Sequence, residues 1–192
     1  MLSEEISHLK QNLDFLQTFE KDIKKIINDL AACIKSKKKI LICGNGGSSA
    51  EAEHLSAEFV VRLKPENNRK ALPLISLSQN SSILTACGND LGFEKIFSRS
   101  LESMGNKGDI LLTLSTSGNS KNILHVLSTA KKKRIKSISL LGSNGGKAKL
   151  LSDINITVPS KNVARVQECH LFLGHYILSQ VERKLMKNLK KS

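Results

Sequence analysis

Two short segments of the chain gather residue types that bind and move charge. The first, Gly44–Ser49, is called the glycine loop, and in it three glycines surround Asn45 before two serines. The second, Ser115–Ser120, is called the serine loop, and it places four hydroxyl side chains within six residues. Hydroxyl groups and free backbone N–H groups can together bind a phosphate without lysine or metal. These two loops therefore predict an anion site, with a phosphate as the expected ligand.

Each loop also has a plainer explanation. The glycine loop lacks the third-glycine spacing of the dinucleotide motif and the Gly-Lys-Ser/Thr of a P-loop, and a tight turn uses glycine for backbone reasons alone. Ser48, with Glu51 three residues later, predicts a capping box at the start of a helix. Capping a helix after the serine loop would need one hydroxyl, not four, so the pattern there favours a phosphate site.

Four other polar side chains are candidates for proton transfer or metal binding. His54 and Glu58 are four residues apart, so on a helix they share one face about one turn apart. Gln167 and His175 are eight residues apart, about two turns along a helix and roughly 80° apart around its axis. The plainer alternatives are a surface His–Glu pair and, because apolar residues flank His175, a core histidine. Spacing alone leaves these alternatives open.

The elements that must position these side chains follow from the hydrophobic pattern. Short apolar runs predict five strands, over residues 40–43, 72–77, 109–114, 137–141 and 154–158. Pro73 limits the second of them to an edge or a strand start. Helical spacing predicts long helices over about 3–34 and about 162–187, with shorter helices between the strands. Residues 78–90 are expected to be irregular.

Strands that alternate with helices indicate a parallel sheet covered on both faces. The expected fold is α/β: a single domain over residues 1–192, built as a three-layer α/β/α sandwich with about five strands in flavodoxin-like order. In such sheets the site lies beyond the carboxyl ends of the strands. Both loops leave strand carboxyl ends, so they should lie on the same edge.

Composition limits the class of protein. Hydrophobic residues make up 40% of the chain and aromatic residues only 4%, which predicts an aliphatic core. The four cysteines have no paired spacing, so we expect reduced, mostly buried thiols. No apolar run reaches transmembrane length, and the N-terminus is acidic where a signal peptide would be basic. The sequence therefore predicts a cytoplasmic protein with no membrane partner.

The net charge of +13 raises the question of a nucleic-acid partner. The lysines cluster in Lys35–Lys39, Lys131–Arg134 and Lys184–Lys191. The first two clusters stand where a helix should end before a strand, and cations there suit the helix dipole. No aromatic side chains alternate with them to stack on bases. We expect no nucleic-acid partner, and a basic field that helps attract a phosphorylated substrate.

These residues together resemble the phosphoheptose isomerases, which are members of the sugar isomerase (SIS) domain family. The resemblance is carried by Gly44–Ser48, His54 with Glu58, Gly88–Asp90, Ser115–Ser120, and Arg165–Glu168 followed by His175, and it covers nearly the whole chain. It implies conversion of sedoheptulose 7-phosphate to D-glycero-D-manno-heptose 7-phosphate. That reaction is the first step toward the nucleotide-activated heptose of lipopolysaccharide or capsule. The resemblance also implies a cytoplasmic homotetramer with sites at subunit contacts.

The resemblance further implies roles for single residues. Glu58 and His175 would form the acid–base pair. One zinc ion per subunit would be held by His54, Glu58, Gln167 and His175. Substrate would contact Asn45, Gly46, Gly47, Glu58, Asn89, Asp90, Ser115, Thr116, Ser117, Ser120 and Gln167.

Two points stand against a simple transfer of those roles. Glu58 cannot easily be a tight metal ligand and a free base at the same time. Some relatives carry an aspartate three residues before the glutamine, where this chain has Ala164. Any role of that carboxylate is therefore absent here or supplied by another residue.

A second class of function stays open as the alternative. SIS proteins that bind a sugar phosphate and the bacterial replication initiator share the fold and the serine loop but are not isomerases. They lack the acid–base pair that Glu58 and His175 would form here. A sugar-phosphate-sensing regulator would usually add a DNA-binding domain, and arabinose 5-phosphate isomerases usually add a regulatory domain, for which we expect no room in 192 residues.

Overall fold

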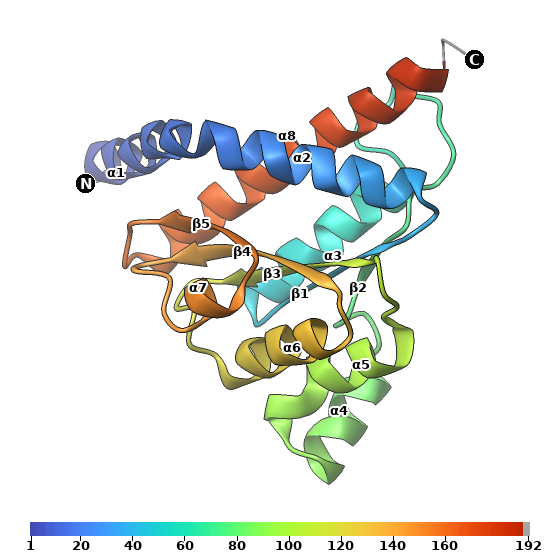
Figure 1. Cartoon of the computed structure of the whole chain (residues 1–192). Coiled ribbons are helices and arrows are strands. Elements are labelled where there is room, and N and C mark those ends of the chain that lie inside the picture. The colour runs from blue at the N-terminus through green and yellow to red at the C-terminus, as the bar shows by residue number, and fades with distance from the viewer. Residues whose placement is uncertain (190–192) are drawn as a thin grey trace.

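The computed structural model describes residues 1–189, which form one parallel sheet covered by helices on both faces (Figure 1). The strands are β1 (Ile40–Gly44), β2 (Leu74–Ser76), β3 (Ile110–Ser115), β4 (Lys136–Gly142) and β5 (Ile154–Val158). Their order is β2-β1-β3-β4-β5, and every neighbouring pair is parallel. This confirms the predicted three-layer fold and its flavodoxin-like order.

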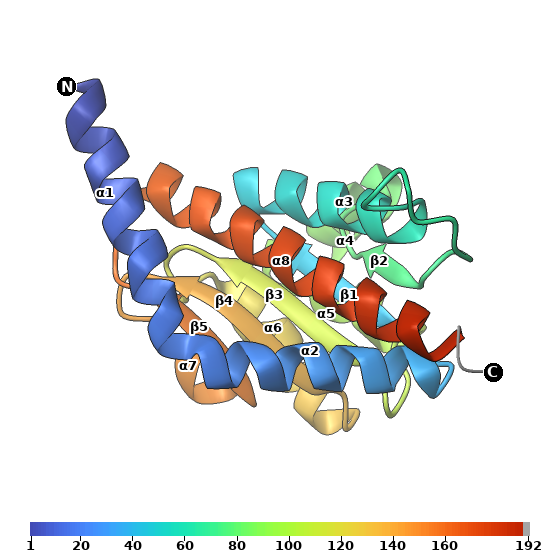
Figure 2. The ribbon, with the colours of Figure 1, turned by 90° about the horizontal axis from the view of Figure 1, so that it is seen from above.

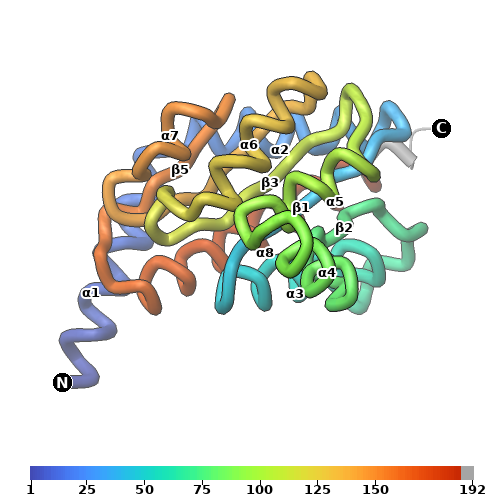
Figure 3. Tube along the Cα trace, turned by 90° about the horizontal axis from the view of Figure 1, so that it is seen from below, coloured from blue at the N-terminus to red at the C-terminus, as the bar shows by residue number. Residues whose placement is uncertain are grey.

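Each face of the sheet packs on its own aliphatic cluster. One face is covered by α1 (Leu2–Phe15), α2 (Glu20–Lys35), α3 (Gly47–Val60) and α8 (Val163–Leu189), and α8 lies between α2 and α3 (Figure 2). The other face is covered by α4 (Ser81–Asp90), η2 (Phe93–Lys95), α5 (Ile96–Met104), α6 (Lys121–Lys132) and α7 (Ala148–Leu151) (Figure 3). The chemistry-bearing helices α3 and α8 are therefore neighbours on the same face.

The prediction of one unbroken N-terminal helix over about 3–34 is wrong. A 3₁₀ turn, η1 (Leu16–Phe19), separates α1 from α2, and α1 turns away from the line of α2 (Figure 2). The two helices bury very different faces: α1 buries only Asn12, whereas α2 buries six residues that pack on the sheet. Leu16 is buried at the bend, whereas Leu9 and Leu13 of α1 pack against the core while only partly buried.

Residues 78–90, expected to be irregular, contain helix α4. Its start is stabilised by the side chain of Asn80, which accepts a hydrogen bond from the backbone N–H of Ile83 at 3.1 Å. Only Cys87 of α4 is buried, so the helix has no apolar stripe that periodicity could detect. Pro73 does precede a short edge strand, as predicted.

The structure also bears on the predictions made for the cysteines, the lysine clusters and membrane-spanning segments. All four cysteines are buried and unpaired. The lysines at 35, 131 and 132 stand in the last turns of α2 and α6, and the cluster Lys184–Lys191 falls partly outside the described residues. Across residues 1–189, no helix combines the length and the hydropathy needed to cross a membrane.

Candidate active site

The glycine loop and the serine loop lie on the same edge of the sheet, because they follow the adjacent parallel strands β1 and β3. Asn45 of the glycine loop and Asn122 form a pair of amide hydrogen bonds of 2.9 and 2.8 Å. Asn122 is buried in the first turn of α6, directly after the serine loop. The side chain of Asn45 is therefore held by the start of α6. Sequence reasoning did not identify Asn122, since nothing in its local pattern indicates a partner 77 residues away.

The predicted capping box at Ser48 and Glu51 is wrong. Helix α3 begins at Gly47, its N-cap is Gly46, and no side chain caps it. The helix thus starts before Ser48, which lies buried inside its first turn. Glu51 keeps a buried Oε2 atom without a hydrogen-bond partner, and burial raises the pKa of this carboxyl to about 7.

Two hydroxyl oxygens of the serine loop accept hydrogen bonds from backbone N–H groups of the same loop. Ser115 Oγ accepts a hydrogen bond from the N–H of Gly118, and Ser117 Oγ accepts one from the N–H of Asn119, both at 3.1 Å. A hydroxyl that accepts one bond still has its own proton to donate. Ser120 is the N-cap residue of α6 but makes no capping hydrogen bond. All three hydroxyls therefore remain able to donate to a phosphate oxygen.

The loop after β4 holds the serine loop in place. Gly118 has φ +63°, and a Cβ there would lie 2.0 Å from the carbonyl oxygen of Gly145, so the position requires glycine. Its carbonyl accepts from the N–H of Ala148 at 2.9 Å. A hollow of about 280 Å³ beside this contact is lined by Thr116, Ser117, Asn119, Ser143, Asn144, Ser160, Lys161, Val163 and Val166. Lys161 gives this region a cation that sequence reasoning did not identify.

Helices α3 and α8 bring His54 and His175 together across 121 residues of sequence. Their Nε2 atoms are 2.9 Å apart, and Glu58 Oε1 lies 3.9 Å from His54 Nε2. The side chain of His54 is 47% exposed and that of Glu58 27%, so the cluster is open to a ligand. His175 is thus not a core histidine. That description fits His170, which is fully buried and whose pKa burial lowers to about 4.

The environment of His175 favours its neutral form. Burial lowers the pKa of His175, the neighbouring His54 lowers it further, and Glu58 acts in the opposite direction. In the direct contact between the two imidazoles, one Nε2 carries the proton and the other accepts it. Two imidazole groups beside a carboxyl group together offer both donors and acceptors of protons.

Close packing continues along the two helices. A Cβ at Gly47 would lie 2.4 Å from Gln167 Nε2, and one at Gly174 would lie 2.5 Å from Leu55 Cδ1. Gln167 therefore lies against the start of α3. Among residues 1–189, however, no group of three or more His, Cys, Asp or Glu side chains has an arrangement that could hold a metal ion. The zinc site stays a prediction.

Asn89 and Asp90 stand at the exposed end of α4, on the other face of the sheet. Asn89 Nδ2 donates to Asp90 Oδ1 at 2.8 Å. This contact joins them to each other and not to the His54–His175 contact. Their part in sugar binding therefore stays a prediction that rests on the resemblance.

Comparison with known proteins agrees with this geometry. The family pattern described as "SIS domain" matches residues 6–142. A relative from a Nitratiruptor species, named phosphoheptose isomerase, is 46% identical over 180 residues, which cover 90% of this chain and 95% of the relative. A solved phosphoheptose isomerase from Francisella tularensis superimposes with a TM-score of 0.85 at 31% identity, covering 95% of this chain and 98% of that one. A second, from Neisseria gonorrhoeae, gives 0.79 at 33% identity, covering 95% and 100%.

Replacing Gly47 by alanine should displace the side chain of Gln167 while leaving the fold intact. The new methyl group would meet the end of a flexible side chain, so we expect the free energy of unfolding to stay within about 1 kcal/mol of wild type. The measurement is the NMR shift of the Gln167 side-chain amide. Gly88→Ala is the control, since a Cβ there meets nothing within 4 Å. An unmoved Gln167 amide in Gly47→Ala would show that the two residues are not in contact.

Glu51→Gln should stabilise the protein more at pH 8 than at pH 5. The folded-state pKa of about 7 lies above the ordinary value of 4.5, so the folded protein binds the extra proton and loses stability as pH rises between these values. Glutamine does not titrate, so the variant does not lose stability in this way as pH rises. Because solvent screens a partly exposed carboxyl, we expect a pH-dependent gain of about 1 kcal/mol.

Urea unfolding of wild type and Glu51→Gln across this pH range measures the gain. Glu53→Gln, at an exposed position of the same helix, is the matched control and should show a smaller one. Equal gains in the two variants, or none in Glu51→Gln, would contradict the burial of a charged Glu51.

Proposed function

The chain belongs to the phosphoheptose isomerases within the SIS domain family, and we propose that it converts sedoheptulose 7-phosphate to D-glycero-D-manno-heptose 7-phosphate. The enzyme is an aldose–ketose isomerase. Its product would feed the nucleotide-activated heptose of bacterial surface glycans. The observation that carries the proposal is the contact of His54 with His175 at 2.9 Å, with Glu58 beside it.

The reaction moves a carbonyl from C2 to C1, which needs proton transfers and no redox partner. A proton leaves C1, a proton arrives at C2, and the proton of the C1 oxygen passes to the C2 oxygen. Two acid–base groups on either side of the enediol can carry out these steps. We assign them to Glu58, whose side chain is partly exposed, and to His175, whose lowered pKa keeps it neutral and ready to exchange a proton.

The serine loop supplies the expected phosphate site. Ser115, Ser117 and Ser120 have hydroxyl protons free to donate, and Thr116 lies beside them in the lining of the adjacent hollow. The N-terminus of α6 adds a favourable dipole for an anion. Lys161 in the same hollow would strengthen phosphate binding. Asn45, Gly46, Gly47, Asn89, Asp90 and Gln167 are proposed to line the sugar.

Zinc is the proposed cofactor, one ion per subunit. Imidazole nitrogen and carboxylate oxygen are donors that zinc takes readily. In this chain His54 Nε2 lies 2.9 Å from His175 Nε2 and 3.9 Å from Glu58 Oε1, and Gln167 would complete the proposed set. When bound, the ion would polarise the substrate carbonyl and stabilise negative charge on the enediolate. Glu58 then serves as base only if its bond to the ion is loose.

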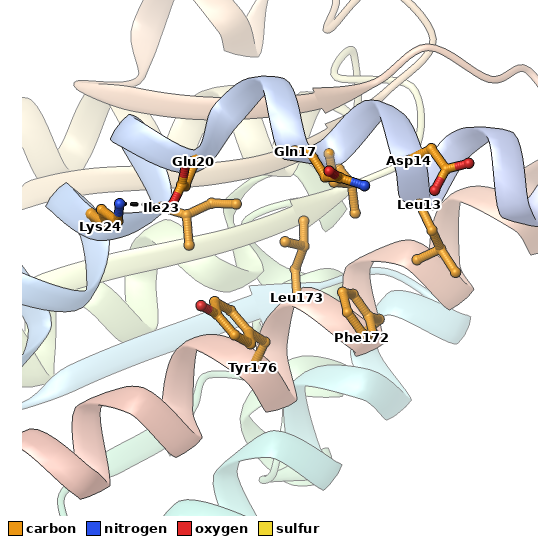
Figure 4. A pocket seen from close by; sticks show the side chains of 10 residues that line it. Leu13, Asp14, Gln17, Glu20, Ile23, Lys24, Phe172, Leu173 and Tyr176 are labelled. Atoms are coloured by element: carbon orange, nitrogen blue, oxygen red, sulfur yellow. Dashed lines mark ion pairs between the residues drawn. The ribbon is translucent and has the colours of Figure 1, made fainter.

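We also propose a homotetramer, as the resemblance implies. A groove of about 530 Å³ runs between α8 and the bend from α1 to α2 (Figure 4). Phe172 and Tyr176 of α8 line it and are 51% and 45% exposed. Large apolar side chains gathered on an exposed groove are typical of subunit contacts. A further copy of this chain is the proposed occupant.

The cysteines indicate the cellular compartment in which the reaction would take place. Four buried, unpaired cysteines suit a reducing compartment, so we place the reaction in the cytoplasm, with no nucleic acid and no membrane as partner. The alternative of a non-catalytic SIS protein that binds the replication initiator is not favoured, because the curated relatives are named isomerases.

Glu58→Gln and His175→Ala should each lower kcat by a factor of about 10² or more while sugar-phosphate binding persists. Both changes remove a proton-transfer group and leave the serine loop intact. Conversion of sedoheptulose 7-phosphate followed by NMR gives kcat, and calorimetry gives binding. Each protein is assayed after removal of metal by a chelator and again after addition of zinc, and the wild type should need the ion.

The control for that experiment is His125→Ala, an exposed histidine on α6, which should behave as wild type. If the wild type binds sedoheptulose 7-phosphate and never converts it, with or without zinc, the isomerase proposal fails. If the chelator-treated wild type keeps its full activity, the proposed role of zinc in the reaction is wrong.

The assembled protein should have a molar mass about four times the 21.1 kDa of the chain. Light scattering measures it directly. Phe172→Glu should give smaller species, because it buries a charge in the proposed contact. Leu150→Glu, an equally drastic change at an 86% exposed site outside the groove, should leave the assembly intact. A monomeric wild type would exclude the tetramer.

A further inference from the structure

A buried ion pair lies between α8 and the segment that connects α3 to β2. The side chain of Glu182 has no exposed surface, and that of Arg69 is 4% exposed. Oε1 of Glu182 accepts from Arg69 Nε, and Oε2 accepts from Asn67 Nδ2 at 2.8 Å. Both carboxylate oxygens are therefore hydrogen-bonded, as a buried charge requires.

The guanidinium group of Arg69 makes contacts in three directions. Besides Nε to Glu182, its Nη1 donates to the carbonyl of Lys70 at 3.1 Å and its Nη2 to the carbonyl of Glu58 at 3.3 Å. Its Cζ also lies 5.6 Å from the ring centroid of Phe59. A lysine ammonium could not reproduce this planar set of donors.

The carbonyl of Glu58 stands in the last turn of α3, where backbone oxygens lack partners within the helix. A cation that bonds there also complements the helix dipole. Glu182 stands seven residues after His175, close to two helical turns, so the two share one face of α8. Arg69 and Glu182 thus connect the backbone carbonyl of Glu58 to α8, the helix that carries His175.

We propose that Arg69 and Glu182 are positioning residues that set the distance between Glu58 and His175. The proposal rests on the proposed function, in which these two residues form the acid–base pair. Neither Arg69 nor Glu182 is placed against substrate. Their effect is exerted through the end of α3, because a small misplacement of a reacting group is enough to slow a reaction severely.

The first test replaces both charges at once, with Arg69→Met together with Glu182→Leu. Apolar residues of similar volume often substitute for a buried pair without loss of folding, whereas removal of one partner leaves an unpaired charge. We expect the double variant to unfold cooperatively with kcat lowered about 10- to 100-fold. KM should change less than about threefold, because the serine loop that binds phosphate is unaltered.

The control is Asp109→Asn, which breaks another ion pair that has a buried carboxylate. Asp109 is 1% exposed and accepts from Lys39 Nζ, whose side chain is 22% exposed, at 2.7 Å. The pair lies at the opposite edge of the sheet from the two loops. This variant should lose thermal stability and keep kcat within about twofold of wild type. A purely structural role for Arg69 and Glu182 would make their double variant behave in the same way.

A second readout does not depend on activity. With histidine labelled at Cε1, the NMR signals of His54 and His175 should shift in the double variant, while those of His8 and His125, on α1 and α6, should not. Arg69→Lys provides the same measurement if the double variant does not fold. Unchanged His54 and His175 signals in a folded variant overturn the proposal whatever its activity. A wild type that converts no sedoheptulose 7-phosphate rejects the proposed function alone, and the histidine signals still decide the positioning role.

Discussion

The close approach of α3 to α8 is the constraint on which the rest of the site depends. The two helices run in the same direction and touch at successive levels, Gly47 with Gln167 and His54 with His175. Next to the second of these contacts, a Cβ at Gly174 would lie 2.5 Å from Leu55 Cδ1, so glycine permits this close approach. Because both helices pack on one face of the same sheet, aliphatic packing brings their polar side chains together. The buried Arg69–Glu182 pair adds a polar contact between the end of α3 and α8.

The two loops at the carboxyl edge of the sheet lead to different kinds of functional group. Strand β3 ends in the serine loop, which is held by the loop after β4 and offers hydroxyl donors to an anion. Strand β1 ends in the glycine loop and leads directly into α3, which carries the titratable groups. The Asn45–Asn122 bonds join the glycine loop to the first turn of α6, directly after the serine loop. A sugar phosphate fixed at one end by the serine loop would therefore present its other end to α3 and α8.

The sequence was most informative where a pattern is local. The runs at Ile40 and Ile110 are short, β-branched or leucine-rich and bounded by polar residues, so they identified the strands. The alternation of strands with helices then indicated the parallel sheet. His54 and Glu58 could be placed on one helix face by spacing alone. Their contact with His175 could not, because eight-residue spacing on another helix says nothing about which helices touch.

Other features depend on tertiary packing that no local pattern encodes. At the bend near Leu16 the burial of the chain changes, since α1 buries only Asn12 and α2 buries six residues. The predicted capping box is absent because helix α3 already begins at Gly47, one residue before Ser48. Asn122 and Glu182 look ordinary in sequence, and their partners lie 77 and 113 residues away. Long-range polar pairs of this kind are recognised only once the fold is known.

The most direct test of this account is a crystal structure of the Glu58→Gln variant with sedoheptulose 7-phosphate bound. The account predicts the phosphate against the hydroxyls of the serine loop, with C1 and C2 of the sugar between the side chain at position 58 and His175. A sugar bound with C1 and C2 away from both α3 and α8 would contradict it, even if the phosphate occupied the serine loop.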